Sequence, residues 1–287
     1  MKSLSVFLLL FVAPLASMAG STEGDTSLVV MTYNIRLNTP DDSINSWPFR
    51  KEKVIGLIAK QEPAVFGLQE ALPDQVRDME KAFPGHARIG VGRDDGKESG
   101  EFSPVFYDKA RFSLIRSGTF WLSEKPSTPG SLGWDAACRR IVTWVKLEDK
   151  TTGKEFCFFN THFDHMGTLA RRNSAFTLMY AVDSIAGKLP VVITGDFNAT
   201  PDSEPIFIMT GRAKPWLLFT DTRSLCPGRT GPSYTYTGFE VGGLPGKLID
   251  FIFVKHIKTV ISHKVIDDHD GRYYPSDHLP VVVRLVF

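Results

Sequence analysis

Several residues that can bind a metal or move a proton stand where apolar, strand-like segments end. Those that follow such segments are Asn34, Glu70, His162, Asp164, Asp196 and Asn198. Asp250 lies inside the apolar run 248–253, where a buried carboxylate is costly unless it is paired. Asp277 and His278 precede the last apolar run. Asn and Asp after a strand often only form turns. The occurrence of so many such residues at strand ends, however, predicts that the strands bring these groups to one sheet edge. Carboxylates there can hold a hard cation such as Mg²⁺.

Six short motifs occur in order along the chain. They are MTYNI at 31–35, GLQE at 67–70, NTH at 160–162, TGDFN at 194–198, IDFI at 249–252 and SDHLPV at 276–281. Together they resemble the motifs of the endonuclease/exonuclease/phosphatase superfamily, the group of deoxyribonuclease-like hydrolases. The resemblance implies an α/β (α+β) fold, a four-layer sandwich with two central mixed β-sheets flanked by helices. It also implies phosphoester hydrolysis, in which water attacks phosphorus and an alkoxide leaves in line.

The resemblance assigns the metal and water-activating roles residue by residue. Glu70 would be the principal ligand of Mg²⁺ or Mn²⁺, with Asn34 and Asp277 beside it. Asp196 would orient or deprotonate the attacking water, and Asn198 would hold this water or the phosphate. Asn198 also begins the glycosylation sequon Asn198-Ala199-Thr200. We interpret this sequon as a coincidence, because a glycan there would block the site.

Two histidines complete the implied site. His278 would bind the scissile phosphate and Asp250 would orient it, since a buried carboxylate fixes the imidazole tautomer and favours the cation. His162 corresponds to the second histidine of the family, with Glu101 as its expected partner. Asp164 and the neighbouring His165 either line the substrate pocket or form a turn.

The apolar runs predict one domain over residues 25–287. Strands are expected at 28–37, 64–69, 87–91, 104–107, 112–122, 141–147, 155–163, 191–197, 248–254 and 279–287. Helices are expected at 48–60, 73–83 and 169–186. Many strands with a few amphipathic helices are typical of sheets packed face to face with helices outside, which agrees with the fold that the motifs imply.

One long segment, 122–142, joins two expected strands and contains Trp134, Arg139 and Arg140. A loop of this length in a compact domain is usually functional or disordered. The functional interpretation places it over the cleft, with Trp134 as a wall and Arg140 on a substrate phosphate, because Arg binds phosphate bidentately. The alternative is that Trp134 fills the core while both arginines face solvent.

The N-terminus predicts export. Lys2 precedes the apolar run 4–15, which is too short to span a bilayer, and Ser17-Met18-Ala19 offers small residues at a cleavage site. We interpret residues 1–19 as a signal peptide of a secreted or periplasmic protein without stable membrane insertion. Three cysteines, Cys138, Cys157 and Cys226, match no zinc-binding spacing. Export would permit one disulfide, although Cys157, in an apolar run, is expected to be a buried hydrophobe.

Charge favours a small substrate. The chain has 33 basic and 32 acidic residues, a net charge of +1, which gives little long-range attraction for a polyanion. We therefore expect a secreted metal-dependent phosphodiesterase or phosphatase acting on a small or short phosphoester. A secreted nuclease cutting DNA or RNA is the alternative, and a non-catalytic binding module with the same fold is a third. The stretch 267–270, rich in Asp, is expected to be a solvated loop; nothing in the sequence indicates an oligomeric state.

Overall fold

The computed structural model describes residues 27–211, 218–243 and 246–287. The predicted signal peptide, residues 1–19, lies outside them. Among the helices of the described ranges, none is long and apolar enough to cross a membrane.

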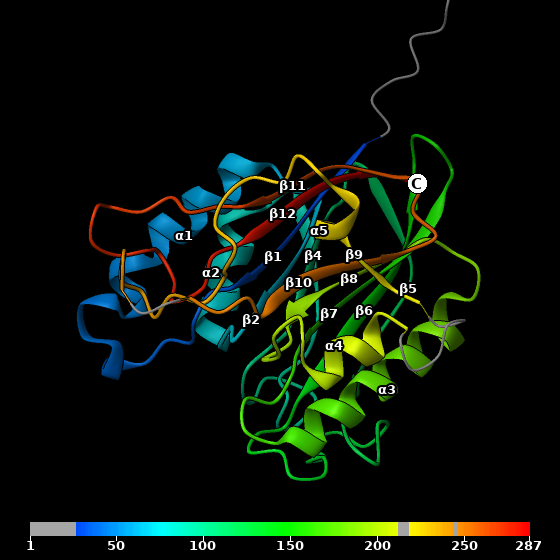
Figure 1. Ribbon diagram of the computed structural model, residues 1–287, viewed down its shortest axis with the longest axis horizontal. Helices are drawn as coiled ribbons and strands as arrows, with labels where there is room; N and C mark the ends of the chain where they lie inside the picture. The colour runs from blue at the N-terminus through cyan, green and yellow to red at the C-terminus, as the bar shows by residue number, and fades with distance from the viewer. Residues whose placement is uncertain (1–26, 212–217, 244–245) are drawn as a thin grey trace, which may run out of the picture.

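Two mixed β-sheets of six strands each form the centre of the molecule (Figure 1). The first has the order β11-β12-β1-β2-β4-β3 and the second β5-β6-β7-β8-β10-β9. The first comprises β1 (Leu28–Asn34), β2 (Val65–Gln69), β3 (His86–Ile89), β4 (Val105–Asp108), β11 (Thr259–Val265) and β12 (Val281–Val286). The second comprises β5 (Phe112–Trp121), β6 (Ile141–Asp149), β7 (Glu155–His162), β8 (Val191–Asp196), β9 (Thr220–Asp221) and β10 (Asp250–Lys255).

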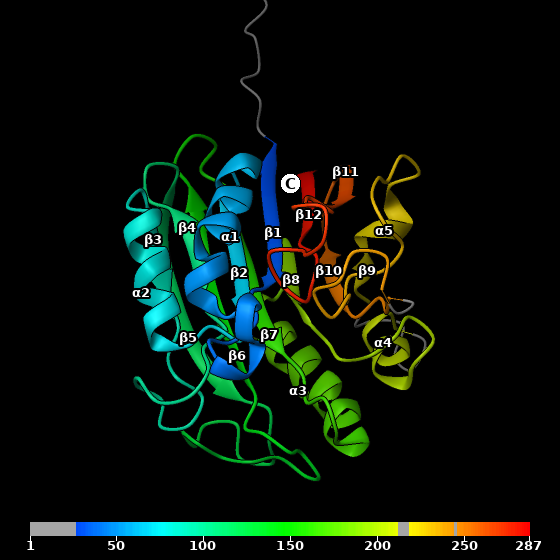
Figure 2. The ribbon, with the colours of Figure 1, turned by 90° about the vertical axis from the view of Figure 1, so that its left-hand side faces the viewer.

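Helices cover the outer faces of both sheets (Figure 2). The helical elements are η1 (Pro40–Asn45), α1 (Trp47–Gln61), α2 (Pro73–Ala82), α3 (Thr168–Ala186), α4 (Glu204–Met209) and α5 (Thr222–Leu225). Leu57 of α1 and Met79 of α2 pack with Phe66 of the first sheet. Leu178 of α3 packs with Ile193 of the second. The predicted four-layer α/β sandwich is therefore confirmed.

Besides the two apolar clusters between the helices and each sheet, a third apolar core lies between the two sheets. Val30 and Val65 of the first sheet pack there with Phe158 and Val192 of the second, all fully buried. Burial of this apolar area, at about 25 cal/mol per Å², holds the sheets face to face. The same packing fixes how the strand ends of one sheet meet those of the other.

All three cysteines are free thiols. Cys157 is fully buried, as predicted, and burial raises the pKa of its thiol to about 11. The stretch 267–270 is a surface loop in which Asp268 and Asp270 pair with Lys60 and Lys53 of α1. This agrees with the interpretation of that stretch as a solvated loop.

Candidate active site

Strand pairing explains why the predicted residues meet. In the first sheet β1 runs parallel to β2, so that Asn34 stands beside Gln69, and Glu70 follows directly. In the second sheet β7 runs parallel to β8, which places His162 beside Asp196, and antiparallel β10 places Asp250 on the other side of Asp196. All these groups therefore gather at one end of the sandwich.

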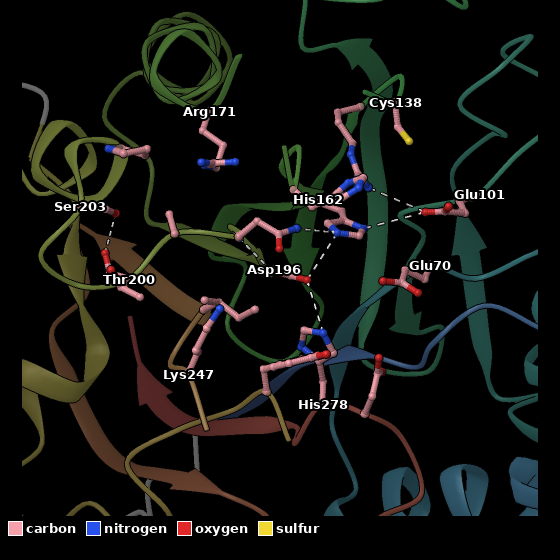
Figure 3. A pocket seen from close by; sticks show the side chains of 18 of the residues that line it. Glu70, Glu101, Cys138, His162, Arg171, Asp196, Thr200, Ser203, Lys247 and His278 are labelled. Atoms are coloured by element: carbon pink, nitrogen blue, oxygen red, sulfur yellow. Dashed lines mark hydrogen bonds and ion pairs between the residues drawn. The ribbon is translucent and has the colours of Figure 1, made fainter. Parts of the chain in front are cut away.

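A cleft of about 910 Å³ opens at this end. Of the predicted site residues, those lining it are Glu70, Glu101, Arg140, His162, Asp196, Asn198, Asp277 and His278. Figure 3 shows the side chains of Glu70, Glu101, His162, Asp196 and His278 turned toward one another across it. Asn34 and Asp250 are buried directly behind these groups.

The two sheets are joined beneath the cleft by buried amides. Asn160 of β7 accepts a hydrogen bond from Gln69 of β2 at 2.6 Å and from the Thr194 hydroxyl at 3.0 Å. Its own Nδ2 donates to the carbonyl oxygens of Leu68 and Pro104. The approach is so close that a Cβ at Gly67 would lie 2.3 Å from the Asn160 side chain. Only glycine fits there, because real Cβ contacts are never that short.

Asp250 and His278 form the hydrogen bond that the sequence predicts, 2.8 Å between Oδ2 and Nδ1. Both side chains are buried. Burial disfavours a charged imidazole, but the charges of Asp250 and Asp196 and this hydrogen bond outweigh it and raise the pKa of His278 well above its usual value. The shift favours the cationic form of His278, whose Nε2 lies 3.7 Å from the Asp196 carboxylate.

Asp196 is poised to accept a proton. Burial, and then the charge of Asp250, raises its pKa to about 7. Its two oxygens accept hydrogen bonds from the Asn34 side chain at 3.0 Å and the Asn198 backbone N–H at 2.9 Å. A carboxylate with a pKa near the working pH is an efficient general base.

Asn198 presents its oxygen rather than its amide protons. Its Nδ2 donates to His162 Nε2 and to the Phe163 carbonyl oxygen, both at 3.0 Å. Burial and the charges of Arg140 and Arg93 lower the pKa of His162 well below its usual value, so this ring is neutral and accepts. The orientation suits Asn198 Oδ1 to holding an attacking water better than to binding a phosphate oxygen.

The acids of the cleft suit a divalent cation. Ligand atoms of Glu70, His162 and Asp196 lie within 4.8 Å of one another. Burial and the charge of Glu70 raise the pKa of Asp277 to about 6, which places its carboxylate in the same repulsive cluster. Oxygen donors that repel one another in a partly buried site fit a hard divalent ion. Asn34, in contrast, turns Nδ2 toward Glu70 and Asp196, while its oxygen accepts from the Arg36 backbone N–H.

Glu101 lies between the second histidine and two arginines. It pairs with Arg93 at 2.7 Å and lies 3.9 Å from His162 Nδ1 and 3.8 Å from Arg140. Burial raises its pKa against the opposing charges of these arginines. The expected proximity of Glu101 and His162 is present, although 3.9 Å is too long for a direct hydrogen bond.

The long segment before β6 differs from its prediction at Trp134. Trp134 is half-buried and is not among the residues that line the cleft. Asp135 explains why: its carboxylate caps the first turn of α3 through the N–H groups of Leu169 and Ala170. This contact anchors the loop at the helix, and only the following residues reach the cleft, with Arg140 buried in its wall and Arg139 exposed outside.

Asp164 does not line the cleft either. Its carboxylate accepts hydrogen bonds from four backbone N–H groups, those of Ala137, Cys138, Met166 and Gly167. Although burial opposes it, these bonds lower the pKa of Asp164. Asp164 therefore shapes a turn, the second of the two alternatives, while His165 lines the cleft and receives a hydrogen bond from Arg140.

Comparison with known proteins identifies the chain. Residues 31–278 match the endonuclease/exonuclease/phosphatase family. The chain belongs to this family. The crystal structure of a family member from Bacteroides vulgatus superposes with a TM-score of 0.85 at 40% identity, covering 91% of this chain and 98% of that one. A mannosyl-6-phosphatase from Bacteroides thetaiotaomicron gives 0.84 at 35% identity, covering 91% and 100%.

A third relative is similar in sequence over a smaller part. Nocturnin from Rattus norvegicus is 26% identical over 197 residues, which is 64% of this chain and 44% of nocturnin. Members of the endonuclease/exonuclease/phosphatase family are phosphoester hydrolases. The chain is therefore a hydrolase of this family.

Some residues that line the cleft were not predicted from the sequence. Arg36, Arg171, Tyr236 and Lys247 face the cleft but lie outside or at the edge of the motifs. Arg36 stands two residues after Asn34 in a left-handed conformation, near the Asp277 carboxylate at 4.0 Å. The position of Arg36 directly after the first motif was the one sequence signal for any of these four residues. The other three reach the cleft only through long-range packing.

Proposed function

We propose that this chain is a secreted, divalent-metal-dependent hydrolase of small phosphoesters, with sugar phosphates as the favoured class. The observation that carries the proposal is a cleft that combines the acid cluster with the buried guanidinium of Arg140. A volume of about 910 Å³ suits a small molecule. The 35% identity with the mannosyl-6-phosphatase supports the sugar phosphate, and residues 1–19 support export.

The residues divide the reaction between them. Asp196 accepts the proton of the attacking water, which Asn198 Oδ1 holds. The His278 cation, fixed by Asp250, neutralises charge on the phosphoryl oxygens. Glu70 and Asp277 would hold the divalent ion, which as a Lewis acid stabilises charge on the phosphoryl and leaving oxygens.

Arg140 would bind a phosphoryl oxygen. It is 5% exposed, and its nearest carboxylates, Asp164 and Glu101, stand 3.6 and 3.8 Å away, too far for full hydrogen bonds. Its Nε and Nη1 are buried and make no hydrogen bond within the described residues, so both donors remain available to an anion. Arg139 offers the matched control, because it is exposed and lies outside the cleft lining.

The test is hydrolysis of a panel that holds mannose 6-phosphate, glucose 6-phosphate, bis-nitrophenyl phosphate, duplex DNA and single-stranded DNA, with and without Mg²⁺ or Mn²⁺. We expect metal-dependent turnover of the sugar phosphates, a fall of about 10–100-fold in kcat/KM for Arg140→Ala, and little change for Arg139→Ala. Efficient, strongly salt-sensitive cutting of long duplex DNA without sugar phosphate hydrolysis would replace the proposal by the nuclease alternative.

A further inference from the structure

Charged side chains line two sides of the cleft. Glu70 and Glu101 lie on one side of Asp196, and Arg171 and Lys247 lie on the other side in Figure 3, with both cations directed into the open space. A scissile phosphate bound by His278 and Arg140 would leave the Arg171–Lys247 wall for the remainder of the substrate.

Arg171 has no acidic partner among the described residues. It belongs to the first turn of α3, where the helix dipole disfavours a cation. Its Nη1 donates a hydrogen bond to the Asp164 carbonyl oxygen at 3.0 Å, which orients the guanidinium without neutralising it. That hydrogen bond uses one nitrogen of the guanidinium, and its remaining donors are available to a ligand in the cleft.

Lys247 is the second cation of the Arg171–Lys247 wall. Its backbone is fixed by pairing with Tyr236, through hydrogen bonds of 2.9 and 3.3 Å, while its side chain is exposed to the cleft. Within the described ranges no carboxylate lies at ion-pair distance from it. Glu204, the acid on this wall, is already paired with Arg172 at 2.9 Å.

We propose that Arg171 and Lys247 form a subsite for a second anionic group of the substrate, remote from the scissile phosphate. The inference rests on the proposed function and refines it, because the preferred substrates would be small phosphoesters that carry a further phosphate or a carboxylate. Two cations facing one space without acid partners attract such a group, whereas a neutral sugar hydroxyl would gain little from them.

A matched series of substrates tests the subsite. Glucose 6-phosphate, 6-phosphogluconate and glucose 1,6-bisphosphate share the 6-phosphate and differ at the first carbon, which bears a neutral hydroxyl, is itself a carboxylate, or bears a phosphate. We expect kcat/KM to be about tenfold higher for at least one of the two substrates that carry a second anionic group, chiefly through a lower KM. The substrate that gains identifies whether carboxylate or phosphate is preferred.

Charge removal on the wall should abolish this preference. In the Arg171→Gln, Lys247→Gln double variant the ratio of kcat/KM between the preferred substrate and glucose 6-phosphate should fall about tenfold, toward one. Lys188→Gln, which removes an exposed cation outside the cleft, should leave the ratio unchanged. Equal kcat/KM for all three substrates in the unaltered enzyme, or a preference that persists in the double variant, would overturn the subsite.

Binding separates this inference from the proposed function. If none of the three sugars is hydrolysed, the proposed function fails, and calorimetric titration of the Asp196→Asn protein with glucose 1,6-bisphosphate and glucose 6-phosphate decides the subsite. Tighter binding of the bisphosphate that disappears on adding Arg171→Gln and Lys247→Gln upholds it. Equal binding of the two sugars overturns it.

Discussion

The pairing of Asp250 with His278 controls the charge of the group that we expect to face the phosphate. Asp250→Asn preserves the size of the side chain and an acceptor for His278 Nδ1 but removes the negative charge. The hydrogen bond is 2.8 Å long and both partners are buried, so solvent screens it little. A hydrogen bond to a charged group contributes about 1.5–3 kcal/mol, and each 1.36 kcal/mol is a factor of ten in rate. We therefore expect kcat/KM at pH 7 to fall about 10–100-fold.

The pH profile gives the sharper readout. Because the pKa of His278 is raised, its cation persists above the ordinary value, and activity that needs it declines only as the pH rises through the raised pKa. Asp250 also raises the pKa of Asp196, which must be ionised to accept a proton. Removing the charge of Asp250 should move the alkaline limb and the acidic limb of kcat/KM both toward lower pH.

The assay is kcat/KM for a small phosphomonoester between pH 5 and 10, supported by NMR titration of His278. The stabilisation from the His278 cation is present below the ordinary histidine pKa of about 6.5 and is lost as the pH rises through the raised value. Asp250→Asn should therefore lower the free energy of unfolding more at pH 6 than at pH 10. On a His278→Gln background the same substitution should cost much less activity. An alkaline limb that coincides with that of the unaltered enzyme would refute the reasoning.

Three further changes test other parts of the site. Glu70→Gln keeps the shape but removes a ligand charge, so we expect weaker activation by Mg²⁺ with partial rescue at high metal concentration; activity that survives both this change and a chelator would contradict the metal assignment. Gly67→Ala places a Cβ 2.3 Å from the Asn160 side chain and should cost about 1–3 kcal/mol of stability, whereas Gly56→Ala, with open space around its Cβ, should not lower the Tm. Cys157, whose pKa burial raises to about 11, should resist iodoacetamide in the native protein and react only after unfolding.

Long apolar runs were sufficient to locate most strands. The strands that were not predicted are short or lie at sheet edges. β11 (Thr259–Val265) alternates exposed and buried residues around Ser262 and Lys264, the composition that natural edge strands use against unwanted pairing. The first strand was expected to continue to residue 37 but ends at Asn34. Arg36 there adopts a positive φ of 54°, which turns the chain into the cleft.

The active-site residues were predictable where a short motif fixes chemistry, and unpredictable where position depends on distant packing. Asp250 could be interpreted from sequence because an isolated carboxylate in an apolar strand requires a partner. Trp134 and Asp164 could not, since their positions depend on contacts made by Asp135 and by four backbone N–H groups. The cations Arg171 and Lys247 reach the cleft from two elements whose approach no local pattern encodes.

Gln69 and Asn160 lie in the motifs but had no predicted role, and they hold the strands that carry the site residues in register. Gln69 precedes Glu70, and Asn160 shares a strand face with His162, because residues two apart in a strand point the same way. The hydrogen bond between Gln69 and Asn160 joins the sheets directly behind Glu70 and His162. Asn160 has both amide protons and its oxygen engaged, so a slip of either strand would leave buried polar groups unpaired, at about 1–3 kcal/mol each. The buried amide pair thus fixes the register in which acids from one sheet meet the histidine and Asp196 of the other.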